Sequence, residues 1–196
     1  MMQRHYAIIG HKTPSTGKLN LNDLSGSGRM DVLVRAINSA LFVSHGIRKD
    51  TTITLHLQGG DGPDRRVLFD GEKLAGVRPD ERSIAGQIKA IMKLPIPPIG
   101  HYKEVTQGIY HSGGDIFNTL DFWEVEKINI NILDAKGIDI NQVSKKEKVG
   151  IILSDDLPFN DKEIGKFTGY QKVSLGEKWL QGHSCIAITQ YVLDKL

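Results

Sequence analysis

Short apolar segments with strand patterns alternate with helical segments along nearly the whole chain, and this alternation limits the folds it can adopt. The predicted strands occupy residues 6–9, 52–57, 65–69, 108–111, 127–133, 149–153 and 171–174. The predicted helices occupy residues 29–46, 79–93, 115–120, 160–167 and 184–195. Such alternation predicts an α/β fold in which helices cover both faces of a sheet.

Terminal signals refine two of these helices. Ser25 or Ser27 is expected to cap the first helix, and Gly46 to end it. Pro79 is expected at the first position of the second helix. The preceding loop, residues 10–28, has a length that compact domains usually keep for function.

Length and composition set the broad class. With 196 residues the chain can bury a sizeable core, and we expect one domain spanning 1–196. The net charge is +2, so nucleic-acid binding requires a local basic patch. The single cysteine, Cys185, excludes an internal disulfide. The chain lacks an N-terminal signal-peptide pattern and a membrane-spanning apolar run, which predicts a cytoplasmic protein with no membrane partner.

The last quarter of the chain contains three loops that adjoin apolar segments. The strand at 149–153 runs into an acidic turn, the strand at 171–174 ends at a Leu-Gly pair, and a small-residue loop at 180–184 opens the last helix. Free backbone groups of three such loops can surround one pocket. This pocket suits a ligand that is recognised through backbone hydrogen bonds and shape, such as the adenosine of a nucleotide-like cofactor.

Three blocks in this order resemble the TrmY family of tRNA pseudouridine N1-methyltransferases, within the knotted SPOUT class. They are residues 26–35 with 44–50, residues 79–83, and the tail at 151–188. The resemblance implies a SPOUT-like, mostly parallel sheet with helices on both faces and a C-terminal deep trefoil knot. It also implies S-adenosyl-L-methionine in the knot, a homodimer, and methylation of N1 of pseudouridine at position 54 of the tRNA T-loop, with no DNA partner.

The chain departs from the family pattern at one place. Relatives commonly have Gly-Asp-His after the strand where this chain has Ser154, Asp155 and Asp156. A side chain at Ser154 narrows the cofactor pocket or donates a hydrogen bond in place of a close backbone approach.

Eight residues near the C-terminus are the expected cofactor contacts. They are Leu133, Ser154, Ser174, Leu175, Gly176, Leu180, Cys185 and Ile186. For Cys185 a nucleophile, a small core residue and a pocket-lining group are all open from the sequence. The resemblance favours the lining role.

Methyl transfer from a sulfonium is an in-line displacement, so the protein must align the reactants and accept the N1 proton. Asp61, in a glycine-rich loop, is the candidate proton acceptor or base contact, and Asp64 is the second choice. The alternative for Asp61 is a simple turn aspartate.

A group of charged residues is the expected RNA-binding surface: Arg29, Asp31, Arg35, Arg48 and Lys49. Guanidinium groups bind phosphate oxygens in a bidentate manner. A surface ion pair between Asp31 and Arg35, four residues apart, is the alternative for those two. The seven histidines show no ligand spacing, and no metal is expected.

Two other functions stay open from the sequence. One is a pseudouridine N1-methyltransferase acting on ribosomal RNA. The other is an RNA-binding or assembly factor with the same fold and no turnover, an idea that the Ser154 departure keeps open.

Overall fold

The computed structural model describes residues 2–143 and 145–196. Eight strands form one sheet: β1 (Gln3–Pro14), β4 (Thr51–Gly59), β5 (Arg65–Asp70), β6 (Lys103–Thr106), β7 (Ile109–Gly113), β8 (Asn129–Asp139), β9 (Lys148–Ser154) and β10 (Gln171–Ser174). Their order is β10-β8-β9-β1-β4-β5-β7-β6. The five strands from β10 to β4 pair in parallel, and β5, β7 and β6 add an antiparallel edge.

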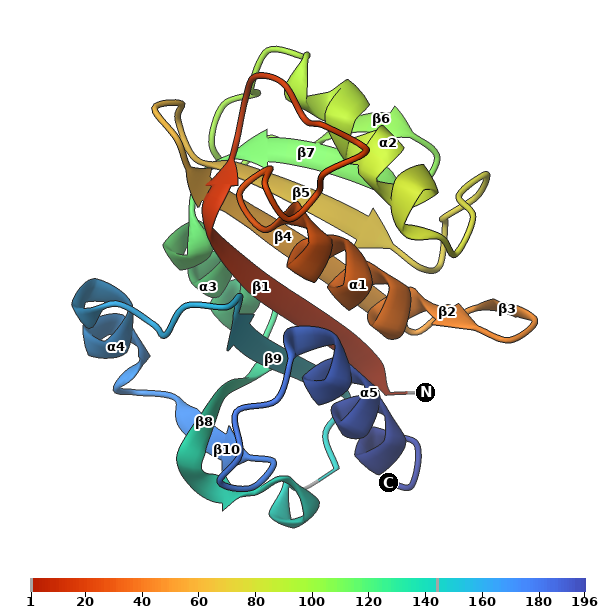
Figure 1. Ribbon diagram of the computed structural model, residues 1–196. Coiled ribbons are helices and arrows are strands. Elements are labelled where there is room, and N and C mark those ends of the chain that lie inside the picture. The colour runs from red at the N-terminus through yellow and green to blue at the C-terminus, as the bar shows by residue number, and fades with distance from the viewer. Residues whose placement is uncertain (1, 144) are drawn as a thin grey trace.

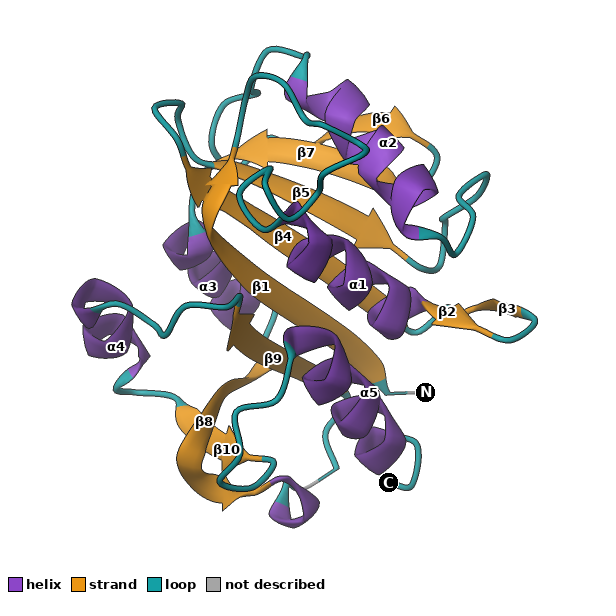
Figure 2. Cartoon of the chain, in the orientation of Figure 1, coloured by secondary structure: helices purple, strands orange, loops and turns teal. Residues whose placement is uncertain are grey.

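Helices cover both faces of this sheet (Figure 2). They are α1 (Met30–Leu41), α2 (Glu81–Met92), α3 (Ile116–Val125), α4 (Asp161–Phe167) and α5 (Gly182–Leu193). A short hairpin of β2 (Phe42–Val43) and β3 (Gly46–Ile47) projects beyond α1, and a 3₁₀ turn covers Ile140–Gln142. Figure 1 shows α1 and α5 in front of β1 and α3 behind the sheet.

The two-residue period of β1 explains the two layers. Tyr6 and Ile8 belong to the core shared with α1, α2 and α5, whereas Ala7 and Ile9 pack with Trp123 of α3 and its neighbours. Successive strand side chains point to opposite faces, so a strand that is apolar throughout needs a helix layer on each side. The predicted α/β fold, with its mostly parallel sheet and two helix layers, is confirmed.

The predicted ends of the first helix are wrong. Arg29 is the N-cap of α1, with a left-handed φ of 61° and no side-chain cap. The Ser27 hydroxyl is already used, because it donates to the Asp23 carbonyl. At the other end the backbone becomes extended at Phe42, and Gly46 lies in β3.

The start of the second helix also differs from its prediction. Asp80 is the N-cap of α2, and its carboxylate accepts a hydrogen bond from the Ser83 N–H at 2.7 Å. Pro79 therefore lies before the cap rather than at the first helical position.

β1 is longer than predicted, and its extra length matters for the site. It continues through Pro14 with an irregularity between Gly10 and Pro14, so the long loop begins later than residue 10. Two glycines pack against this end of the strand. A Cβ at Gly28 would lie 2.3 Å from the Lys12 carbonyl oxygen, and a Cβ at Gly59 would lie 2.3 Å from the Lys12 carbonyl carbon. These close approaches bring the loop before α1 and the end of β4 against residues 12–14.

α5 lies beside α1 and over β1 (Figure 1). The Gln190 amide donates to the Ala40 carbonyl at 2.9 Å, and the Tyr6 and Thr189 hydroxyls lie 3.0 Å apart. The first residue of the helix, Gly182, faces Ile8 and Leu153. The loop that enters α5 is thus placed over the carboxyl end of β9. No helix among the described residues has the length and apolar character needed to cross a membrane.

Candidate functional site

A cavity of about 370 Å³ opens where the carboxyl ends of β9 and β10 meet the middle of β8 and the start of α5. Strands that run parallel end at the same edge of a sheet, and ligands bind at such edges. The cavity is lined by residues 133–136, 153–155, 157–159, 164, 172–173, 175–176, 178–180, 182 and 185. The three C-terminal loops predicted to surround one pocket therefore do meet, and residues 134–136 of β8 add a wall that was not predicted.

Six of the eight expected cofactor contacts line this cavity: Leu133, Ser154, Leu175, Gly176, Leu180 and Cys185. Ser174 and Ile186 do not. The Ser174 hydroxyl donates to the Ala135 carbonyl at 3.1 Å and accepts from the Gly176 N–H at 3.0 Å, so it joins two of the lining segments. Ile186 is fully buried in the core, because the helical turn points it away from the side occupied by Cys185.

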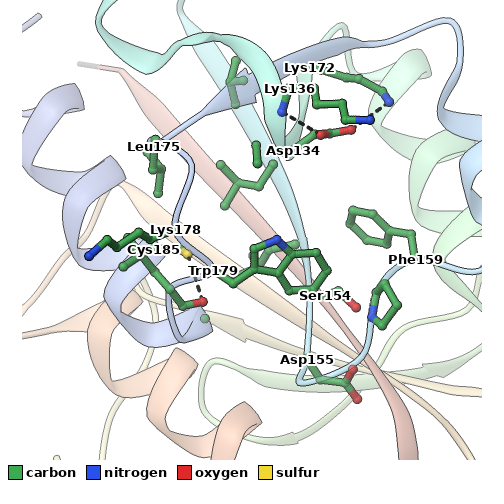
Figure 3. A pocket seen from close by; sticks show the side chains of 18 of the residues that line it. Asp134, Lys136, Ser154, Asp155, Phe159, Lys172, Leu175, Lys178, Trp179 and Cys185 are labelled. Carbon is green, nitrogen blue, oxygen red and sulfur yellow. Dashed lines mark hydrogen bonds and ion pairs between the residues drawn. The ribbon is translucent and has the colours of Figure 1, made fainter.

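Charged and aromatic side chains are among those that line the cavity (Figure 3). Lys172 forms an ion pair with Asp134 at 2.8 Å, and the Lys136 N–H donates to the same carboxylate at 2.9 Å. The Trp179 side chain is drawn in the middle of this view, and Phe159 lies on the far side from Cys185. Trp179 is 79% exposed. The cavity thus combines an apolar interior with a charged rim.

Ser154 contacts its own loop and the neighbouring strand β1. Its hydroxyl donates to the Leu157 carbonyl and lies 3.5 Å from Nδ1 of His11. Ser154 also lines the cavity, and the acceptor of its hydroxyl proton belongs to the protein itself.

His11, on β1, is a site residue that the sequence did not indicate. Its Nδ1 lies 2.9 Å from Asp155 Oδ1, its backbone N–H donates to Asp155 Oδ2 at 2.8 Å, and its Nε2 lies 3.0 Å from Glu163 Oε2. Burial disfavours the imidazolium, but the hydrogen bonds to Asp155 and Glu163 outweigh it and raise the pKa of His11 to about 9. His11 is therefore charged at neutral pH.

Arg29 links the pocket loop to α1. Its guanidinium donates to Asp31 at 3.0 and 3.2 Å and to Asp156 at 3.0 Å. Arg35 lies 3.6 Å from Asp31 and donates to Glu81 at 2.8 Å. The ion pair between Asp31 and Arg35 that was considered as an alternative is present, as part of a longer network.

The other two predicted RNA-binding residues lie elsewhere. Arg48 donates to both carboxylate oxygens of Asp194, at 2.9 and 2.7 Å, near the chain termini. Lys49 donates to the Glu72 carbonyl. They follow the far end of α1, whose 12 residues span about 18 Å. The five predicted residues therefore form two groups.

Asp61 is exposed in the loop between β4 and β5 and does not line the cavity. Gly62, next to it, packs against Ser15 and Thr16, just beyond the end of β1. The second choice, Asp64, is partly buried, and burial together with the nearby charge of Asp115 raises its pKa. A raised pKa makes a carboxylate a better proton acceptor near neutral pH.

Cys185 shows no sign of an activated nucleophile. Burial raises the pKa of its thiol, and its Sγ donates to the Leu180 carbonyl at 3.7 Å. Reactive cysteines instead have lowered pKa values.

Across residues 2–143 and 145–196, no group of three or more His, Cys, Asp or Glu side chains is arranged to hold a metal ion. His11, Asp155 and Glu163 are close together, but the two carboxylates contact opposite nitrogens of the imidazole ring.

Solved structures support the fold. The crystal structure of Archaeoglobus fulgidus Nep1 bound to S-adenosylhomocysteine matches with a TM-score of 0.69 at 9% identity, and the match covers 99% of this chain and 98% of that chain. At this identity the likeness concerns the fold.

Sequence comparisons identify the family. A protein of Methanocella arvoryzae named tRNA (pseudouridine(54)-N(1))-methyltransferase is 34% identical, over 98% of this chain and 99% of its own length. A protein of the same name from Methanospirillum hungatei is 35% identical, over 97% and 95%. The family model described as "Putative SAM-dependent RNA methyltransferase" matches residues 3–196. The chain belongs to this family of RNA methyltransferases, which depend on S-adenosylmethionine.

Proposed function

We propose that this chain methylates N1 of pseudouridine 54 in the tRNA T-loop, using S-adenosylmethionine. The observation that carries the proposal is the full-length likeness to enzymes named for this reaction, combined with a cavity at the parallel strand ends. In the reaction the S–CH₃ bond breaks and an N1–CH₃ bond forms. The N1 proton passes to an acceptor, and S-adenosylhomocysteine is released.

The residues around the cavity fit this cofactor. Leu133, Leu175 and Leu180 offer apolar surface for the adenine ring, and the loops at 154–159 and 175–180 offer backbone donors and acceptors. Asp134, Lys136 and Lys172 offer charges that suit the ammonium and carboxylate groups of the methionine part. When bound, S-adenosylmethionine would supply the methyl group.

The RNA would approach near the irregular end of β1. Gly28, next to Arg29, and Gly59, two residues before Asp61, both pack against Lys12. The hydrogen bond from Arg29 to Asp156 adds the pocket loop to the same region. Arg29 and Arg35 are partly exposed and suit phosphate contacts. Arg48 and Lys49 would touch RNA only at a separate part of the surface.

Asp61 is the proposed proton acceptor, because it is exposed on the loop whose glycines pack against Pro14, Ser15 and Thr16 at the end of β1. Asp64 remains its alternative. Single-turnover methyl transfer with Asp61→Asn and Asp64→Asn separates the two. The aspartate whose replacement by asparagine lowers the methyl-transfer rate about 100-fold or more is the proton acceptor, since general bases contribute roughly this much to a rate. A smaller loss of the methyl-transfer rate in both variants would contradict both assignments.

A homodimer is proposed from the exposed face of α5. Ile188 and Tyr191, three residues apart on that face, are 37% and 60% exposed. Leu180 and Trp179, at 39% and 79%, lie just before the helix beside the cavity. A second copy would cover this apolar surface.

Three further expectations stay predictions. Threading of the C-terminal segment through a preceding loop rests on the family resemblance. The one-domain organisation is supported by the single eight-stranded sheet. The cytoplasmic location rests on the sequence.

Calorimetry with S-adenosylhomocysteine tests the proposed cofactor site. We expect one binding event per chain. If S-adenosylhomocysteine gives no measurable binding heat and does not compete with S-adenosylmethionine, the proposal is contradicted and a factor without turnover is favoured. If the ligand binds, methyl transfer to purified tRNA and to ribosomal RNA fragments distinguishes the two RNA classes.

A further inference from the structure

We propose that His11, as an imidazolium, is a positioning residue that holds one wall of the cofactor cavity by bridging Asp155 and Glu163. This inference rests on the proposed function, because it concerns the affinity of the same cavity. His11 is not among the residues that line the cavity. It would act through the loop and helix that it joins.

The first contact of the bridge fixes the start of the wall. Asp155 accepts hydrogen bonds from the backbone and the ring of His11, and from the Leu157 N–H at 3.0 Å. The Asp155 N–H in turn donates to the Ile9 carbonyl at 3.0 Å. The acidic turn is thus attached to β1 by both its backbone and its side chain. Ser154, Asp155 and Leu157 all line the cavity.

The second contact fixes the far end of the wall. Glu163 is the N3 residue of α4 and forms a capping box with Asn160: its carboxylate accepts from the Asn160 N–H at 2.9 Å, and its own N–H donates to Asn160 at 3.0 Å. The same carboxylate contacts Nε2 of His11. The next residue, Ile164, lines the cavity, as do Pro158 and Phe159 before the helix. One imidazole ring therefore anchors both ends of the segment from 154 to 164.

Charge explains why this ring must be protonated to act. The Asp155 and Glu163 side chains are only 1% and 2% exposed, and an unpaired buried carboxylate is costly. The neutral ring has one N–H, so it can donate to only one of the two carboxylates, whereas the imidazolium donates to both. The groups that face the ring are Asp155 after β9, Glu163 on α4 and the Ser154 hydroxyl. Loss of the proton would release one end of the wall.

The test is the affinity for S-adenosylhomocysteine, measured by calorimetry with His11→Gln, the double variant His11→Gln/Glu163→Gln, and the exposed-surface control His101→Gln. At about pH 7 we expect a roughly tenfold or larger loss of affinity with His11→Gln. The double variant should recover most of the lost affinity for S-adenosylhomocysteine, because the second substitution removes the unpaired carboxylate. His101→Gln should bind like the wild type, since His101 is exposed.

The pH profile separates a positioning role from a merely structural one. The wild type should lose affinity as the pH rises through about 9, while His11→Gln should lack this decrease. The Cys185 thiol is present in both proteins, so the difference between the profiles isolates His11. A folded His11→Gln protein that binds within about twofold of the wild type would overturn the inference. If that variant does not fold, a wild-type affinity that stays constant from about pH 7.5 to 10 would overturn it. Absence of binding to the wild type would overturn the proposed function itself.

Discussion

Each polar side chain of the segment Ser154, Asp155 and Asp156 has a partner within the protein. Ser154 donates to the Leu157 carbonyl, Asp155 is held by His11, and Asp156 accepts from Arg29. These partners come from the loop itself, from β1 and from the start of α1. The segment is thus fixed by contacts from three parts of the chain.

Replacement of Ser154 by glycine should reduce stability more than cofactor affinity. The lost hydrogen bond to Leu157 is expected to cost about 1 kcal/mol in the free energy of unfolding. The dissociation constant for S-adenosylhomocysteine should change by less than about threefold, because the hydroxyl is already engaged within the loop. Urea unfolding and calorimetry measure the two effects. A tenfold loss of affinity at unchanged stability would mean that the hydroxyl contacts the ligand.

The His11 bridge should also make stability depend on pH. Its pKa is raised to about 9 in the folded protein, above the unfolded value near 6.5. The stabilisation is therefore complete below about pH 6.5 and is lost as the pH rises through about 9. Urea unfolding of the wild type and His11→Gln across this range should give a difference that shrinks with pH. A difference independent of pH would contradict the bridge.

Among the elements, α5 has two unlike faces. Thr189, Gln190 and Leu193 are buried against α1 and β1, while Ile188 and Tyr191 are exposed. Burial of the first face fixes the helix on the sheet. The second face exposes the large side chains of Ile188 and Tyr191, which is the basis for the proposed dimer.

The double substitution Ile188→Glu/Tyr191→Glu should convert a dimer into monomers without unfolding it, because charges placed in an apolar interface are strongly disfavoured. Sedimentation velocity measures the change. Val125→Glu, at a residue on α3 that is 78% exposed, is the matched control and should leave the dimer intact. Equal sedimentation of all three proteins would contradict an interface on α5.

Strand cores could be predicted from the sequence, but several element ends could not. The range 171–174 matches β10, because turn residues, Gly169 and Gly176, flank it on both sides of the buried, β-branched Val173. Two features depend on tertiary contacts: the left-handed Arg29 is held by Asp31 and Asp156, and β8 extends to Asp139 by pairing with β10. A third, the exposed edge strand β6, could not be predicted because it carries no apolar pattern.

At the scale of the whole molecule, the parallel half of the sheet places the pocket. The ends of β9 and β10 meet at one edge, so loops predicted separately do form one cavity. His11 was missed because its partners lie 144 and 152 residues away in sequence. Arg48 and Lys49 were grouped with Arg29 by closeness in sequence, but a helix of about 18 Å separates them.

Methylation of N1 of pseudouridine 54 is tested by methyl transfer to two T-loop hairpins that differ only in carrying pseudouridine or uridine at position 54. After incubation with S-adenosylmethionine, nuclease digestion and mass spectrometry identify the product. We expect 1-methylpseudouridine in the first hairpin and no methylation of the second, because N1 of uridine is bonded to the ribose. Equal methylation of both hairpins, or none in either while the cofactor binds, would contradict the proposed function.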